Sequence, residues 1–206
     1  MNTSLSDDWL ECLADELAAG GLVIRDDFLP PALIDLLAGE CRLRQAQGLL
    51  APAAIGRGGA QAVRQAVRGD AIQWLEPGQS ACTDAYLSAM DRLRLTLNRS
   101  LFLGLEDYES HFAFYPAGAF YQRHLDRFRD DDRRTLSAVL YLNRDWLAED
   151  GGALRGYPGG QVLDVVPLAG RLVLFRSAEL LHEVLPARRE RLSLTGWFRR
   201  RGRGVL

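Results

Sequence analysis

The feature that most constrains the fold is a change of pattern near residue 108. Before it, apolar residues recur at the three-to-four spacing of helices; after it, the chain breaks into short runs rich in aromatic and branched side chains. Turn signals separate these runs: Pro116-Ala117-Gly118, Asp150-Gly151-Gly152, Pro158-Gly159-Gly160 and Ala169-Gly170. Helices followed by many short strands predict an α+β chain whose strands form a barrel or sandwich.

The first half predicts three helices. Ser6 is an expected N-cap, and Gly20-Gly21 stops the first helix. A second helix should start near Pro31, and a third should occupy residues 83–101. The segment 68–75 is expected to be a turn that leads into a strand. Further strands are expected at 111–115, 120–126, 136–142, 161–166, 171–175 and 191–198.

Length and composition favour a single soluble domain, 1–206. Of its 206 residues, 48% are hydrophobic and 25% are charged, with a net charge of −2. No apolar run approaches the roughly 20 residues that cross a bilayer, and residues 1–8 lack the features of a signal peptide. We therefore expect a cytoplasmic protein without a membrane partner. Its three separated cysteines form no C-x-x-C motif and are expected to be small buried hydrophobic side chains.

Charge is unevenly distributed along the chain. Residues 1–40 are acidic, whereas residues 188–203 are rich in arginine, and every basic residue of the chain is an arginine. A basic chain end can contact nucleic acid, but a solvated tail is the simpler interpretation because the whole chain is not basic. The segment Gly56-Arg57-Gly58-Gly59 is expected to be a flexible loop and not a phosphate cradle, because no Gly-Lys-Ser/Thr follows it.

The candidate chemistry centres on two of the three histidines. His124 and Asp126 are two residues apart, so on a strand both side chains would reach one ion. His182 follows a later strand and could supply a third ligand. Two histidines and one carboxylate leave open positions on a metal, as in non-haem Fe(II) oxygenases; the His-Glu-x-x-His motif of many zinc hydrolases is absent.

Arg191 begins the last predicted strand, with Ser193 on the same face. A guanidinium there offers a planar, two-pronged site for the carboxylate of a dicarboxylic co-substrate.

At these residues the chain resembles the Fe(II)/2-oxoglutarate dioxygenases, and within them the hypoxia-inducible-factor-type prolyl 4-hydroxylases, most of all the short bacterial members associated with elongation factor Tu. The resemblance spans residues 68–198. It is dense in four blocks: Arg68-Gly69-Asp70-Ala71-Ile72-Gln73-Trp74; Tyr115-Pro116 with Tyr121-Gln122-Arg123-His124-Leu125-Asp126; Tyr141-Leu142-Asn143-Arg144-Asp145-Trp146 with Gly151-Gly152-Ala153-Leu154-Arg155; and His182-Glu183-Val184 with 191–197.

The resemblance implies a double-stranded β-helix, or jelly-roll, core at 108–198, helical support mainly at 1–105 and an Arg-rich tail at 199–206. It also implies roles for individual residues. Those implied to bind iron are His124, Asp126 and His182; those near 2-oxoglutarate are Arg191, Tyr141 and Tyr115; those near a substrate peptide are Tyr121, Trp197, Arg68, Asp70 and Arg134. A mobile segment, 53–75, is expected to close over the peptide.

The reaction implied is Fe(II)- and 2-oxoglutarate-dependent 4-hydroxylation of a prolyl residue with O2, releasing succinate and CO2, with ascorbate as the reductant and elongation factor Tu as the substrate. The turn between Tyr115 and His124 is one residue shorter than in the animal enzymes. This difference concerns which peptide the enzyme binds, and not the reaction that it catalyses. Three alternatives remain open at this point. They are a dioxygenase acting on nucleic acid, one acting on another side chain or a small metabolite, and a non-enzymatic 2-oxoglutarate- or oxygen-responsive binding module.

Overall fold

The computed structural model describes residues 6–54, 64, 66–127 and 131–202. Its elements in chain order are α1 (Asp7–Gly20), β1 (Leu22–Arg25), α2 (Pro31–Ala46), β2 (Ala51–Pro52), β3 (Ala71–Trp74), α3 (Ala81–Leu101), β4 (Leu105–Tyr115), β5 (Tyr121–His124), β6 (Arg134–Tyr141), β7 (Leu154–Gly156), β8 (Leu163–Val165), β9 (Leu172–Arg176), β10 (His182–Val184) and β11 (Arg191–Arg200), with short 3-10 turns at Ala148–Asp150 and Pro158–Gly160. The expected loop at 56–59, and most of the expected mobile segment before Arg68, lie outside the described residues.

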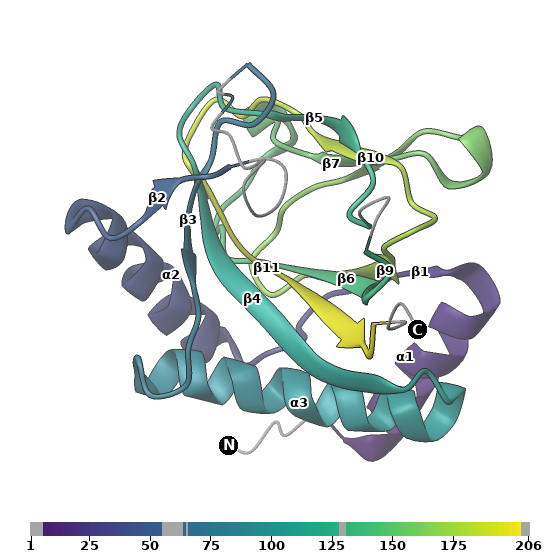
Figure 1. Cartoon of the computed structure of the whole chain (residues 1–206). Helices are drawn as coiled ribbons and strands as arrows, with labels where there is room; N and C mark the ends of the chain where they lie inside the picture. Colours follow the sequence, from purple (N-terminus) through teal and green to yellow (C-terminus); the bar gives the residue numbers. More distant parts are fainter. Residues whose placement is uncertain (1–5, 55–63, 65, 128–130, 203–206) are drawn as a thin grey trace.

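Two antiparallel sheets form the β part, which confirms the predicted α+β class. The larger sheet has the order β1-β9-β6-β11-β4-β3-β2, and the smaller has the order β5-β10-β7-β8. Figure 1 shows the helices packed along the larger sheet and the smaller sheet on its other side. Among the described residues, no helix is long and apolar enough to span a membrane.

Two of the three helices begin where the sequence predicts. The Ser6 side chain accepts a hydrogen bond from the backbone N–H of Trp9, and Gly21 ends α1 in the left-handed conformation. Helix α3 starts two residues earlier than predicted, because Ser80 accepts from the N–H of Thr83 and is the N-cap. Helix α2 starts at Pro31 as expected.

Alternation along the long strands gives the larger sheet two different faces. On β11, Leu192, Leu194 and Phe198 belong to the apolar core shared with the helices. The residues that alternate with them, Arg191, Ser193 and Thr195, point to the other side, into the space between the two sheets. Strands β4 and β6 follow the same alternation, so polar side chains from three neighbouring strands meet on one face.

Several predictions at the edges of elements are wrong. The strand predicted at 120–126 ends at His124, the last residue paired with β10, so Asp126 lies beyond it. Strand β4 begins at Leu105, because its pairing with β11 continues to Arg200. Strands β1, β2, β7 and β10 were not predicted, since each has only two to four residues.

The cysteines also differ from expectation: only Cys41 is buried. Cys12 lies on the outer side of the amphipathic helix α1, where its thiol contacts Glu16, and Cys82 is half-buried.

Candidate active site

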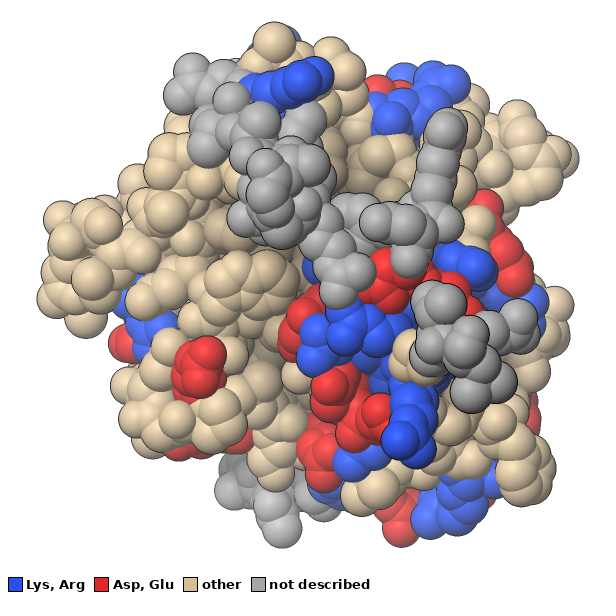
Figure 2. All heavy atoms as spheres, in the orientation of Figure 1, with Lys and Arg blue, Asp and Glu red and all other residues tan. Residues whose placement is uncertain are grey.

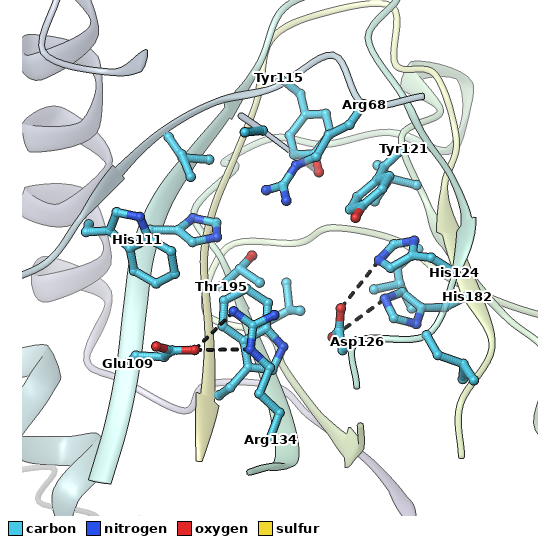
Figure 3. A pocket seen from close by; sticks show the side chains of 18 of the residues that line it. Arg68, Glu109, His111, Tyr115, Tyr121, His124, Asp126, Arg134, His182 and Thr195 are labelled. Carbon is cyan, nitrogen blue, oxygen red and sulfur yellow. Dashed lines mark hydrogen bonds and ion pairs between the residues drawn. The ribbon is translucent and has the colours of Figure 1, made fainter. Parts of the chain in front are cut away.

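A pocket of about 450 Å³ opens between the two sheets. Both sheets line it, the larger with Tyr115 and Arg191 and the smaller with Tyr121, His124 and His182. Figure 3 shows the labelled side chains converging on this space from opposite sides. The candidate residues, though distant in sequence, therefore gather at one cavity.

His124, Asp126 and His182 form the described group that could hold a metal ion, with one ligand atom from each within 4.8 Å of the others. The Asp126 carboxylate faces both rings from one side: His124 Nε2 is 3.4 Å from Oδ1, and His182 Nε2 is 3.8 Å from Oδ2. His124 pairs with His182 across the β5–β10 ladder. The two histidines are thus held by strands, and Asp126 reaches them from the segment after β5.

Backbone carbonyls fix both imidazole rings. His124 Nδ1 lies 2.7 Å from the carbonyl oxygen of Gln122, and His182 Nδ1 lies 3.0 Å from that of Leu180. Because a carbonyl can only accept, each Nδ1 carries a hydrogen, and each Nε2 faces Asp126. This is the arrangement that orients histidine ligands around a metal.

The charge states also suit a metal. Burial lowers the pKa of His182 below its ordinary value, although Asp126 opposes the shift, so this imidazole is neutral at pH 7. Burial alone would raise the pKa of Asp126, but His182 and His124 outweigh it and the pKa is lowered. Two imidazole nitrogens and an ionised carboxylate are the donor set of non-haem Fe(II) centres.

Arg191 lies deeper in the pocket as a buried cation. It is 2% exposed, and its Nε donates to the carbonyl oxygen of Gly152 at 2.9 Å. Among the described residues no carboxylate pairs with it. The nearby Tyr141 hydroxyl and Ser193 hydroxyl are also buried without a hydrogen-bond partner there. A buried guanidinium beside two unpaired hydroxyls fits a carboxylate ligand such as that of 2-oxoglutarate.

Two residues that the sequence interpretation did not assign hold Arg191 in place. Gly152 has φ +68, and a Cβ there would lie 3.3 Å from Arg191 Cδ and 2.9 Å from Ala187 Cβ. Only glycine allows this approach. Asn143 is buried and bonds the backbone of Leu192 in both directions, at 2.7 and 3.0 Å. An asparagine after a strand resembles an ordinary turn residue, so the sequence offered no signal of this role.

Tyr115 and Tyr121 extend from Arg191 towards the metal group. The Arg191 guanidinium carbon is 5.0 Å from the ring centroids of both Tyr115 and Tyr141. The Tyr121 ring stacks on His124 with centroids 3.7 Å apart. Burial raises the pKa of Tyr115 above its ordinary value, so its phenol stays protonated. The structure thus places Tyr115 beside the co-substrate candidates and Tyr121 beside the metal candidates.

The residues predicted to lie near a peptide divide into two places. Arg68 lines the pocket and donates two hydrogen bonds to the buried Asp70 carboxylate, at 2.6 and 2.8 Å. On the other side, Arg134 lies over the Trp197 ring at 3.4 Å and pairs with Glu109. Asp70 does not line the pocket; it holds Arg68 in position.

Comparison with known proteins gives a consistent result. Residues 110–199 match the profile of the 2OG-Fe(II) oxygenase superfamily. Mouse prolyl hydroxylase EGLN3 is 31% identical over 198 residues, covering 92% of this chain and 82% of that protein. A Pseudomonas putida prolyl-4-hydroxylase structure is 58% identical, with a TM-score of 0.87, covering 94% of this chain and 100% of that one. A Trichoplax adhaerens prolyl hydroxylase, solved with a hypoxia-inducible-factor peptide fragment, is 26% identical with a TM-score of 0.85, covering 94% and 90%.

Proposed function

The chain belongs to the 2OG-Fe(II) oxygenase superfamily, as an enzyme of the prolyl 4-hydroxylase class, and we propose that it hydroxylates a prolyl residue of elongation factor Tu. Its fold is the double-stranded β-helix of that superfamily, and its cofactors are Fe(II) and 2-oxoglutarate. We assign the whole chain to one catalytic domain that acts in the cytoplasm.

When bound, Fe(II) and 2-oxoglutarate supply the oxidising chemistry, in which O2 is consumed, succinate and CO2 are released and ascorbate keeps the iron reduced. The protein holds and orients these groups. In our assignment His124, Asp126 and His182 ligate the iron. Arg191 and Tyr141 bind the far carboxylate of 2-oxoglutarate, and Tyr115 lies near its metal-bound end.

One observation carries the assignment above the others. The three ligand atoms lie within 4.8 Å of one another, and two backbone carbonyls turn the histidine Nε2 atoms towards Asp126. Surface histidines have no reason to be oriented this way. The buried, carboxylate-free Arg191 at the other end of the same pocket supports a dicarboxylic co-substrate.

The apolar part of the pocket wall suits a prolyl side chain. Tyr121 and Trp197 supply aromatic surface, and Val139 and Val184 supply aliphatic surface. A pyrrolidine ring is apolar and compact, so such walls can hold it while excluding water from the reacting carbon. Arg68 and Arg134 stand at two sides of this space and can bind peptide carbonyls.

Elongation factor Tu is proposed because the chain resembles the short bacterial prolyl hydroxylases associated with that protein, and because of its 58% identity to the Pseudomonas putida enzyme. A nucleic-acid substrate is less favoured, since Arg199 pairs with Asp107 and Glu109, and Arg200 with Asp132. Figure 2 shows arginines interleaved with acids on this face, without a continuous basic surface.

The test is peptide mass spectrometry of elongation factor Tu after incubation with the protein, Fe(II), ascorbate and O2, with and without 2-oxoglutarate. We expect a 2-oxoglutarate-dependent gain of one oxygen on a prolyl residue, absent with Asp126→Ala. Succinate formation with no oxygen on elongation factor Tu would retain the enzyme class and reject this substrate. If neither succinate nor an oxidised prolyl residue is formed, the catalytic assignment is rejected.

A further inference from the structure

A second pair of buried polar atoms lies on the pocket face, away from the carboxylate-binding group. His111 Nε2 and Trp197 Nε1 are both buried and have no hydrogen-bond partner among the described residues. Both side chains line the pocket, and their ring centroids are 5.6 Å apart. His111 is 1% exposed and Trp197 is 4% exposed. Leaving such groups unpaired in a buried position is destabilising, so a ligand for them is expected.

The hydrogen-bonding roles of the two atoms are complementary. His111 Nδ1 lies 3.0 Å from the carbonyl oxygen of Phe112, so Nδ1 carries the hydrogen and Nε2 is a bare acceptor. Burial lowers the pKa of His111 to about 4, with Arg68 and Arg134 acting in the same direction and Asp70 against it, so the ring is neutral at pH 7. The indole Nε1 of Trp197 can only donate. The wall therefore offers one donor and one acceptor.

Neighbouring side chains position this pair at the side of the pocket. His111 extends from β4 towards the cavity in Figure 3, opposite Thr195 in the β4–β11 register. Trp74, at the end of β3, packs edge-on against His111 with centroids 5.0 Å apart and lies 6.2 Å from the Trp197 ring. Trp74 is 44% exposed. Its partly exposed ring therefore borders the pair on the solvent side.

We propose that His111 and Trp197 form a subsite that binds the backbone N–H and C=O of a substrate residue flanking the target proline. The proposal rests on the proposed peptidyl-prolyl substrate. An extended residue presents its N–H and C=O to the same side, as in a β-ladder, and so matches an acceptor beside a donor. A prolyl residue has no N–H, so the target itself cannot satisfy His111. The pair thus requires a non-proline residue at one fixed position in the substrate sequence relative to the target proline.

The test uses a prolyl peptide that the enzyme oxidises, taken from elongation factor Tu or from a fixed-proline peptide library screened by succinate formation. Each flanking residue is N-methylated in turn, and kcat/KM is measured for the wild type, His111→Leu and His111→Gln. We expect one N-methylation to lower wild-type kcat/KM about tenfold, as the loss of one hydrogen bond to a buried acceptor would. In His111→Leu the same methylation should change kcat/KM less than twofold.

Two controls separate binding from a structural effect. His111→Leu should leave the apparent 2-oxoglutarate affinity unchanged, and His111→Gln, which restores an acceptor oxygen, should recover most of the sensitivity to N-methylation. Equal effects of N-methylation in the wild type and His111→Leu would overturn this subsite while leaving prolyl hydroxylation intact. If no prolyl peptide is oxidised at all, the proposed function and this inference both fail.

Discussion

The two faces of the larger sheet come from the same strands but carry different side chains, apolar on the helix face and partly polar on the pocket face. On β11, Leu192 and Leu194 face the helices and are completely buried in the apolar core. Between them, Ser193 lies on the opposite face, which carries the pocket-lining residues Arg191 and Thr195; it is also buried, but its hydroxyl has no partner among the described residues. Burial is similar on both faces; only the pocket face leaves polar atoms unpaired.

Four of the five described buried polar atoms without a partner lie on this pocket face: His111 Nε2, Tyr141 hydroxyl, Ser193 hydroxyl and Trp197 Nε1. A face built for stability alone would replace these groups with apolar ones, since an unpaired buried polar group is destabilising. The difference teaches that the helix face serves folding, whereas the pocket face is completed by ligands. Substitutions on the helix face should therefore lower the free energy of unfolding, whereas substitutions on the pocket face should weaken ligand binding with little loss of stability.

The largest effect is expected at the metal group. Asp126→Ala should abolish 2-oxoglutarate-dependent succinate formation, because the only carboxylate of the proposed ligand set is lost. Its melting temperature should remain near that of the wild type, because Asp126 lies outside the apolar core. Binding of Mn(II), measured by calorimetry, provides the parallel readout. Continued succinate formation by this variant would place the metal elsewhere.

Adjacent residues of β11 give the sharpest contrast in stability. Leu194→Ala should lower the free energy of unfolding by about 2–5 kcal/mol, because it leaves a cavity in the core. Ser193→Ala should change it by less than about 1 kcal/mol, because it removes an unpaired hydroxyl. Urea denaturation measures both. A large loss in Ser193→Ala would mean that the pocket face also contributes to folding stability.

The pH dependence of stability should distinguish His111. Its folded pKa of about 4 lies below the ordinary 6.5, so the unfolded chain takes up a proton first. This histidine therefore destabilises the fold as pH falls from about 6.5 towards 4, by about 2.5 kcal/mol at pH 4.5. His111→Leu should lose less stability than the wild type between pH 7.5 and 4.5. If both proteins lose the same amount of unfolding free energy over this pH range, His111 is not buried as a neutral ring.

Arg191→Lys tests the carboxylate-binding end. An ammonium group cannot reproduce the two-pronged guanidinium, so the apparent KM for 2-oxoglutarate should rise tenfold or more, about 1.4 kcal/mol. Iron binding should be unchanged, because Arg191 is not a ligand in our assignment. Unchanged co-substrate affinity would remove Arg191 from that role.

Much of this arrangement could be predicted from the sequence. Local signals predict the N-cap at Ser6 and the helix start at Pro31, and the helix–strand change near residue 108 predicts the α+β class. The candidate residues His124, Asp126, His182 and Arg191 were singled out by spacing and resemblance, and the structure brings them to one pocket.

Other features depend on contacts that a single sequence does not reveal. Asp126 was expected on a strand beside His124, but pairing with β10 ends at His124. The short strand of His182 exists because β5 and β7 flank it. The unpaired Nε2 of His111 becomes visible only when Trp74 and Trp197 are placed around it. Tertiary partners, and not local propensity, decided each of these cases.

The measurement that tests the central claim most directly is a paired study of Tyr141→Phe. Calorimetry with Mn(II)-loaded protein gives the Kd for 2-oxoglutarate, and urea denaturation gives the free energy of unfolding. If the pocket face is completed by the co-substrate, the variant should be as stable as the wild type or slightly more stable, and should bind 2-oxoglutarate about tenfold more weakly. Unchanged 2-oxoglutarate binding, with or without a loss of stability, would contradict the account.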